Sequence, residues 1–200
     1  IFEDDALLIV DKPAGLAVHG GSGVSFGVIE QLRAAYPQLK FLELVHRLDK
    51  ETSGLLVLAK KRSALVHLHE QIRNGRMDKR YYAILKGQLT DKVTHVKAPL
   101  HKYVAANGER RVVVAHEGEG QSAHTQFNVE QIAGGYTAVR VKIFTGRTHQ
   151  IRVHSASIEH PIVGDDKYGD FELNKQLGKN TGTRMFLHAH SLKFVHPQTG

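Results

Sequence analysis

The chain has 200 residues, of which 41% are hydrophobic and 24% charged, and this is enough to bury one substantial core. Lysine and arginine together number 27 against 20 aspartates and glutamates, which gives a formal net charge of +7 and an isoelectric point near 9.6. This balance favours a polyanionic partner such as nucleic acid, although ordinary surface charge would also produce it. The sequence has no cysteine, which excludes disulfide scaffolds, thiolate metal sites and cysteine nucleophiles. It also has no apolar run as long as a membrane span or a signal peptide.

Three helices are predicted from apolar residues that recur at helical spacing. The first is expected to take Ser25 as its cap and to end near Pro37. Ser63 is expected to cap the second helix, and Asn74 with Gly75 is expected to close it. The predicted helices span residues 26–36, 64–73 and 149–159.

Short apolar or alternating runs, bounded by turn residues, predict the strands. The expected strands cover residues 6–10, 54–59, 81–85, 111–115, 125–132, 137–144, 185–189 and 192–195. Because helices and strands do not alternate regularly, the pattern favours an α+β fold with a largely antiparallel or mixed central sheet and flanking helices. We expect residues 1–200 to form a single domain. The polar stretch 165–184 is expected to be either a binding loop or a mobile surface connection.

One motif, His-Arg-Leu-Asp-Lys-Glu-Thr-Ser-Gly at residues 46–54, stands at the start of a predicted strand. A turn at this place would present the carboxylate of Asp49 in a cleft. Aspartate is also a common turn former, and an ion pair with Arg47 would give it a purely structural role. The residues alone leave both interpretations open.

A second motif, Thr-Gly-Arg-Thr-His-Gln-Ile-Arg-Val-His at residues 145–154, places two arginines and a helix start after a strand. This combination is typical of an anion site. An arginine such as Arg152 can hold a carboxylate in its charged form, as a nucleophilic aspartate requires. His149 and His154 are five residues apart, so they do not share a helical face as zinc-binding histidines four apart do. We therefore expect no metal site.

Both motifs resemble the signature segments of RNA pseudouridine synthases of the RluA type. Further segments match that family in the same order along the chain, at residues 11–15, 18–19, 79–83, 186–189 and 196–197. The resemblance implies the pseudouridine synthase fold and the isomerisation of specific uridines in RNA, here large-subunit ribosomal RNA. It further implies a cytoplasmic, monomeric enzyme with no cofactor and no membrane partner. An RNA-binding domain of the S4-like type is expected upstream of these residues.

The resemblance also implies roles for individual residues. Asp49 would be the catalytic aspartate, Arg152 would pair with it, and Tyr81 would contact the target base and act as a base. Pattern alone would make Tyr81 an ordinary core residue. The residues implied to bind substrate or RNA are Arg47, Leu187, Arg147 and His149. Leu187 would pack against the flipped base, and Arg47 would fill the space that the target nucleotide leaves.

Two other classes of function stay open on the sequence. The basic charge would suffice for an RNA-binding module without catalysis. A carboxylate-dependent hydrolase of nucleic acid would use paired acids, either Asp49 with Glu51 or Asp165 with Asp166.

Overall fold

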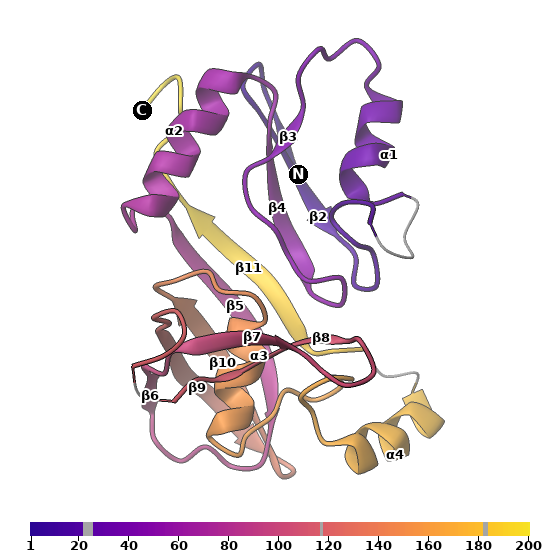
Figure 1. The fold of residues 1–200 in the computed structure, drawn as a ribbon, viewed down its shortest axis with the longest axis vertical. Coiled ribbons are helices and arrows are strands. Elements are labelled where there is room, and N and C mark those ends of the chain that lie inside the picture. Colours follow the sequence, from indigo (N-terminus) through magenta and orange to yellow (C-terminus); the bar gives the residue numbers. More distant parts are fainter. Residues whose placement is uncertain (22–25, 117, 182–183) are drawn as a thin grey trace. The chain divides into compact units, whose positions relative to one another are not determined.

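The computed structural model describes residues 1–21, 26–116, 118–181 and 184–200 (Figure 1). The chain divides into two compact units, one formed by Ile1–Lys79 with His188–Gly200 and the other by Arg80–Leu187. The described residues form four helices and eleven strands, and the expected α+β class with a mixed sheet is confirmed. No helix in these ranges is both long and apolar enough to span a membrane.

The first unit is built around β4 (Ser53–Ala59), a strand that is almost entirely buried, as the sequence predicts. Its neighbours follow the order β1-β2-β4-β11, and β3 also pairs with β4. The pairing with β2 is antiparallel and joins Lys12 to Gly54, whereas β11 runs parallel to β4 and pairs His188 with Ser53. The other elements of this unit are β1 (Phe2–Glu3), β2 (Leu7–Lys12), α1 (Val28–Ala35), β3 (Glu43–Leu44), α2 (Arg62–Arg73) and most of β11 (Leu187–Lys193).

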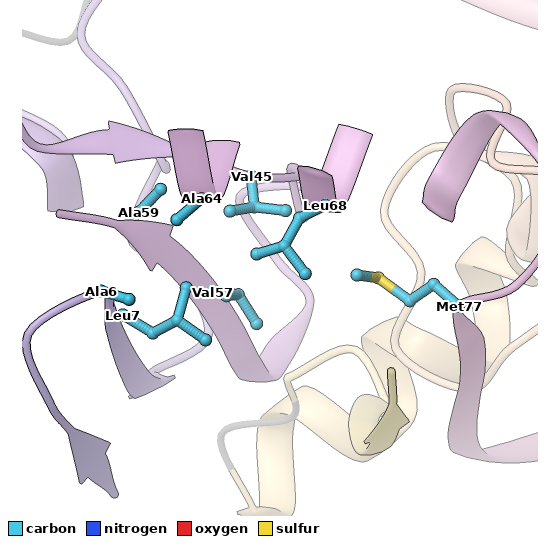
Figure 2. Packing of buried hydrophobic residues seen from close by; sticks show 8 residues of the cluster. All are labelled: Ala6, Leu7, Val45, Val57, Ala59, Ala64, Leu68 and Met77. Carbon is cyan, nitrogen blue, oxygen red and sulfur yellow. The ribbon is translucent and has the colours of Figure 1, made fainter. Parts of the chain in front are cut away.

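The core of the first unit lies between β2, β4 and α2. Figure 2 shows side chains from these elements directed toward one another, with Met77 reaching in from the segment after α2. The buried members are Ala6, Leu7, Val45, Val57, Ala59, Ala64, Leu68 and Met77. Leu7, Val57 and Leu68 are fully buried, and each stabilises the fold by about 1.5–3 kcal/mol through removal of its apolar surface from water. This packing fixes the strand that follows the first motif.

The second unit contains four strands in the order β5-β10-β9-β6, in which the pairs β10-β9 and β9-β6 are antiparallel. Gly134 and Gly135, both with positive φ, form the two-residue turn between β9 and β10, a conformation that glycine adopts without strain. A separate hairpin, β7-β8, has its second strand beside α3 (Figure 1). The elements of this unit are most of β5 (Asp78–Lys86), β6 (Val93–Val96), β7 (Leu100–Val104), β8 (Arg110–Val114), β9 (Thr125–Ala133), β10 (Tyr136–Ile143), α3 (Gln150–Ser157) and α4 (Phe171–Thr181).

Several local predictions are wrong. The second helix begins at Arg62 with Lys61 at its cap position, because Arg62 is already helical and Ser63 lies inside the first turn. The stretch 165–184 is not simply a loop, since it contains α4, whose start is capped by the carboxylate of Asp170 bonded to the backbone N–H of Leu173 at 2.8 Å. The two short strands expected near the C-terminus are one strand, β11, and the third helix ends at Ser157. The predicted cap Ser25 lies outside the described residues.

Candidate active site

The first motif forms a tight turn between β3 and β4, as the sequence predicts. The backbone N–H of Thr52 donates to the carbonyl of Asp49 at 3.1 Å, which closes the turn. The N–H of Gly15 donates to the carbonyl of Lys50 at 2.9 Å and joins this turn to the segment after β2. The Asp49 side chain is half-buried, and Arg47 is exposed. The turn therefore holds a carboxylate at the border between protein and solvent.

A buried ammonium group holds the turn in place. Lys12, only 1% exposed, donates through Nζ to the carbonyls of Pro13 at 2.8 Å, Leu16 at 2.7 Å and Lys50 at 3.0 Å. Burial lowers the pKa of Lys12 to about 8, and the negative charges of Glu51 and Asp49 oppose that change. Three charge-assisted hydrogen bonds thus join the segment after β2 to the motif that carries Asp49.

The first motif ends where β4 meets β11. Gly54 has φ +112, and a Cβ there would lie 2.3 Å from the carbonyl oxygen of Ala189, so only glycine allows the two strands to approach so closely. Beside it, Ser53 Oγ and His188 Nδ1 lie 2.9 Å apart at hydrogen-bond distance. The last position of the motif is therefore fixed by strand packing.

His46, at the start of the motif, is a neutral acceptor. Its Nε2 accepts the backbone N–H of Val57 at 3.2 Å. Burial, together with the positive charge of Lys79, lowers the pKa of His46 to about 4, although a backbone hydrogen bond opposes this. A neutral ring with Nε2 unprotonated fits that bond, which fastens the turn to β4.

The second motif is held together by the buried side chain of Gln150. Its Oε1 accepts from Thr145 Oγ1 at 2.7 Å and from the backbone N–H of Arg147 at 3.0 Å. Its Nε2 donates to Thr125 Oγ1 at 2.9 Å and to the carbonyl of His124 at 3.0 Å. One amide thus uses both its donors and its acceptor to fix the loop before α3.

Arg152, on the buried side of α3, forms a buried ion pair. Its Nε and Nη2 donate to the two carboxylate oxygens of Asp165 at 2.8 and 2.7 Å, and the two residues are 4% and 0% exposed. Asp166, which is largely exposed, lies 3.3 Å from the same Nη2. Burial alone would raise the pKa of Asp165, but Arg152 and backbone N–H groups lower it overall. This bidentate pair fixes the direction of the guanidinium.

Tyr168 connects Arg152 with two other parts of the second unit. Its ring lies under the Arg152 guanidinium, 5.2 Å from ring centroid to Cζ. Its hydroxyl accepts the backbone N–H of Val112 at 3.0 Å and lies 2.7 Å from His149 Nδ1. His149 has φ +53, in the left-handed region, which is uncommon for a residue with a side chain. The hydroxyl bond supports this strained residue at the start of α3.

His154 has a structural role. It is fully buried, with Nδ1 2.8 Å from Thr125 Oγ1 and Nε2 2.9 Å from the carbonyl of Ala98. Because a carbonyl only accepts, Nε2 carries the proton. Burial lowers the pKa of His154, partly offset by the bond to Ala98. Within the part of the chain that the structure describes, no three histidine, aspartate or glutamate side chains are grouped to hold a metal ion.

The remaining site residues of the second unit differ in exposure. Strand alternation in β5 buries Tyr81 and leaves Tyr82 40% exposed, which fixes which of the two tyrosines faces the interior. Leu187 is buried, and Arg147 is exposed with its Nε donating to the carbonyl of Ser122 at 3.0 Å. Asp49 and Arg47 belong to the first unit. The pairing of Arg152 with Asp49 stays a prediction.

Several residues of the site were missed by the sequence predictions. Lys12 belongs to a family segment, but no role was predicted for it; a lysine directly after an apolar strand is the signal that could have suggested one. Asp165 was considered only as a possible hydrolytic acid, and Tyr168 and Gln150 were not considered at all. Their roles depend on contacts between distant segments, which local pattern does not contain.

Known proteins resemble the chain in sequence. Residues 6–157 match the model of the family described as RNA pseudouridylate synthase. The chain is 54% identical over 202 residues to ribosomal large subunit pseudouridine synthase C of Escherichia coli (strain K12), and 52% identical over 200 residues to the protein of that name from Pasteurella multocida (strain Pm70). These alignments cover 100% of the chain but only 63% and 61% of the two relatives. The chain thus spans less than two thirds of their length.

Solved structures share its fold. Human RNA Pseudouridylate Synthase Domain Containing 1 matches with a TM-score of 0.82 and 24% identity, over 98% of this chain and 78% of that one. Human RNA Pseudouridylate Synthase Domain Containing 4 matches with a TM-score of 0.77 and 28% identity, over 96% and 82%. The expected pseudouridine synthase fold is therefore confirmed. With a family match over most of its length and relatives above 50% identity, the chain belongs to the RNA pseudouridylate synthase family.

Proposed function

We propose that this chain is the catalytic domain of an RNA pseudouridine synthase that isomerises uridines in large-subunit ribosomal RNA. Membership of the family and the names of the relatives support the reaction and the RNA class. The observation that carries the proposal is the Asp49 turn, which a buried lysine and two backbone hydrogen bonds hold in one conformation. Such pre-organisation is what a nucleophile at a reaction centre requires.

The reaction rearranges bonds within one nucleotide. The bond between N1 of uracil and C1′ of ribose breaks, the base turns, and C5 bonds to C1′. The proton on C5 leaves and N1 gains one, so atoms and electrons balance without an oxidant, a reductant or a co-substrate. We accordingly propose that the chain needs no cofactor.

Asp49 acts at C1′ of the target ribose in this proposal. Its carboxylate either attacks C1′ or stabilises the positive charge that develops there as the bond to N1 breaks. Tyr81 contacts the base and takes the proton from C5, and Leu187 packs against the base while it is detached. Arg152 completes the set by pairing with the carboxylate, and its own direction is fixed by Asp165.

The target nucleotide must leave the RNA stack, which costs a few kcal/mol. Arg47 and Arg147 are exposed, and with His149 they offset this cost through contacts with the RNA. Arg47 enters the space that the target nucleotide has left. We further propose that the domain acts as a monomer in the cytoplasm, and that an upstream RNA-binding segment of the longer protein adds selectivity.

The two alternative classes receive less support. The pair Asp165 and Asp166 is poorly suited to hydrolysis, because Asp165 is fully buried and both its oxygens bind Arg152. A binding module without catalysis would not require a turn that holds the carboxylate of Asp49 in one conformation.

Release of tritium from C5 of uridine in unmodified large-subunit ribosomal RNA tests the proposal. The native chain should release tritium, and Asp49→Asn should not. Asp5→Asn removes one charge from an exposed aspartate of the same unit and serves as the matched control, so it should react like the native chain. RNA affinity, measured on the same samples by filter binding, separates loss of chemistry from loss of binding.

Equal release by the native chain and Asp49→Asn would remove Asp49 from the mechanism. Tight binding with no release by any variant would favour the binding-module alternative. Strand cleavage or free uracil would identify a hydrolase instead.

A further inference from the structure

A pocket of about 230 Å³ lies in the second unit, where the base of the β7-β8 hairpin meets two loops. Leu100 and Val112, both buried, form its apolar part. Gln121 closes the base of the hairpin, since its backbone exchanges two hydrogen bonds with Leu100, at 2.8 and 2.9 Å. Arg147 and Thr148 of the second motif complete the lining. The pocket therefore borders a proposed RNA-binding segment without being part of the Asp49 turn.

The polar lining of this pocket suits an anion. Lys102, which lies opposite the buried Val112 on the same face of the hairpin, and Arg147 bring two positive charges. Gln121 and Thr148 are residue types with hydrogen-bond donors. None of the described residues that line the pocket carries a carboxylate. Cationic and hydroxyl groups of this kind make most of the contacts that proteins form with RNA phosphates.

The pocket is built on fixed backbone. Gly120 has φ +77, and a Cβ there would lie 2.6 Å from the Cβ of Ala115 and 2.9 Å from the carbonyl oxygen of Leu100, so this wall tolerates no side chain. The Nε of Arg147 donates to the carbonyl of Ser122 at 3.0 Å, and this bond restricts the orientation of the guanidinium. A pre-formed site loses less entropy when a ligand binds.

The size of the pocket limits the ligand. Clefts that enclose drug-sized molecules measure about 300–1,000 Å³, so this pocket admits only part of a nucleotide. The apolar and the positively charged residues of the lining match a ribose and its phosphate, respectively. We propose that the pocket binds one ribose-phosphate unit of the substrate RNA outside the target nucleotide, with Lys102 and Arg147 contacting its phosphate.

This inference rests on the proposed function, because it assumes that RNA is the substrate. It adds a contact with the RNA on the β7-β8 hairpin, and it assigns Lys102 a role in affinity for the RNA backbone. Lys102 touches no reacting atom in this proposal, so its loss should weaken RNA binding and raise KM while kcat is unchanged.

The test compares Lys102→Gln with Lys92→Gln in the complete chain. Both lysines are exposed in the second unit, and Lys92 does not line the pocket, so the two variants share one change in net charge. Equilibrium binding to a large-subunit ribosomal RNA transcript is measured over a salt series, with Asp49→Asn in the background to prevent turnover.

Lys102→Gln should weaken binding about two- to fivefold and reduce the slope of log affinity against log salt by about 0.7, the contribution of one phosphate contact on single-stranded RNA. Lys102→Arg should restore both values. Combining Lys102→Gln with Arg147→Gln should cost less than the product of the single effects, because both side chains contact one phosphate. When Lys92→Gln is combined with Arg147→Gln, the loss of affinity should equal the product of the two single effects.

A scan of single methylphosphonate linkages, which remove one phosphate charge at a time, should find a linkage at which Lys102→Gln causes no further loss. Equal affinity and slope for Lys102→Gln and Lys92→Gln would overturn the inference, as would strict multiplication of the Lys102 and Arg147 effects. Tritium release distinguishes failure of this inference from failure of the proposed function. If the native chain isomerises uridine while the Lys102 variants bind normally, only the pocket assignment fails; if binding responds as expected but no uridine reacts, the proposed function fails.

Discussion

Replacement of Lys12 by methionine should change how the stability of the chain depends on pH. The side chain is 1% exposed and donates to three backbone carbonyls. Burial lowers its pKa from the ordinary value of 10.5 to about 8. Methionine has a similar length and no titratable group, so the variant removes this proton equilibrium while filling much of the same space.

The sign follows from proton counting. Below about pH 8 the Lys12 amine is protonated in both the folded and the unfolded chain, and its contribution is constant. Between about 8 and 10.5 the unfolded chain binds more protons than the folded one, so the free energy of unfolding rises with pH through this group. At about 1.4 kcal/mol per pH unit, the full gain is roughly 3 kcal/mol. Lys12→Met should lack it.

Urea unfolding followed by far-UV circular dichroism, at a series of pH values from about 7 to about 10.5, measures this difference. The stability of the native chain minus that of Lys12→Met should rise across the series, because all other titrations cancel in the subtraction. Lys40→Met, at an exposed lysine of the same unit, should give a difference that does not change with pH. A flat difference for Lys12→Met as well would refute the desolvation of this ammonium group.

Three further substitutions test how the site is held, each by the free energy of unfolding. Gly54→Ala should cost about 2–4 kcal/mol, because its φ is +112 and the new Cβ would lie 2.3 Å from a backbone oxygen; Gly75→Ala, with open space and φ +65, should cost about 1 kcal/mol. Asp165→Asn should cost about 3–5 kcal/mol by leaving a buried guanidinium without its charge partner, whereas Asp166→Asn should change stability by less than about 0.5 kcal/mol. Tyr168→Phe should cost about 1–3 kcal/mol, because a backbone N–H loses its acceptor.

Each of these expectations has a clear contrary result. Similar costs for Gly54→Ala and Gly75→Ala would show that β11 can move away from β4. Equal effects of Asp165→Asn and Asp166→Asn would mean that the buried ion pair contributes no more than an exposed one. Native stability in Tyr168→Phe would show that water replaces its hydroxyl between α3 and the hairpin.

Elements with a strong apolar pattern could be predicted from the sequence. The buried run of β4, the helical spacing in α1 and α2 and the alternation in β9 and β10 identify these elements to within two residues at each end. The alternation in β5 also identifies that strand, which starts three residues before the predicted position. The missed strands β1, β3, β6 and β7 are two to five residues long, too short for periodicity to be recognised. The start of α4 carried a signal that was overlooked, since Asp170 stands three residues before Leu173, whose N–H it caps.

The site was predictable only in part. Motif spacing located the turn that carries Asp49 and the helix that carries Arg152. It did not reveal that Asp165 holds this arginine, because the two residues are brought together by a loop whose path no local rule fixes. The hydrogen bond from Lys12 to the carbonyl of Lys50, across 38 positions of sequence, cannot be recognised from the local pattern either. Conformations such as the left-handed backbone of His149 also arise from tertiary contacts, here from the bond to Tyr168.

The parallel pairing of β11 with β4 has a consequence for biosynthesis. Ser53 meets His188 across 135 positions of sequence, and a ribosome that adds about 5–20 residues per second needs roughly 7–27 seconds to supply the partner. During that interval the edge of β4 near Ser53 lacks its neighbour, while the whole of Arg80–Leu187 emerges. Unpaired strand edges invite association with other chains, and contacts so distant in sequence form slowly. The first unit therefore completes its sheet last, although most of it is synthesised first.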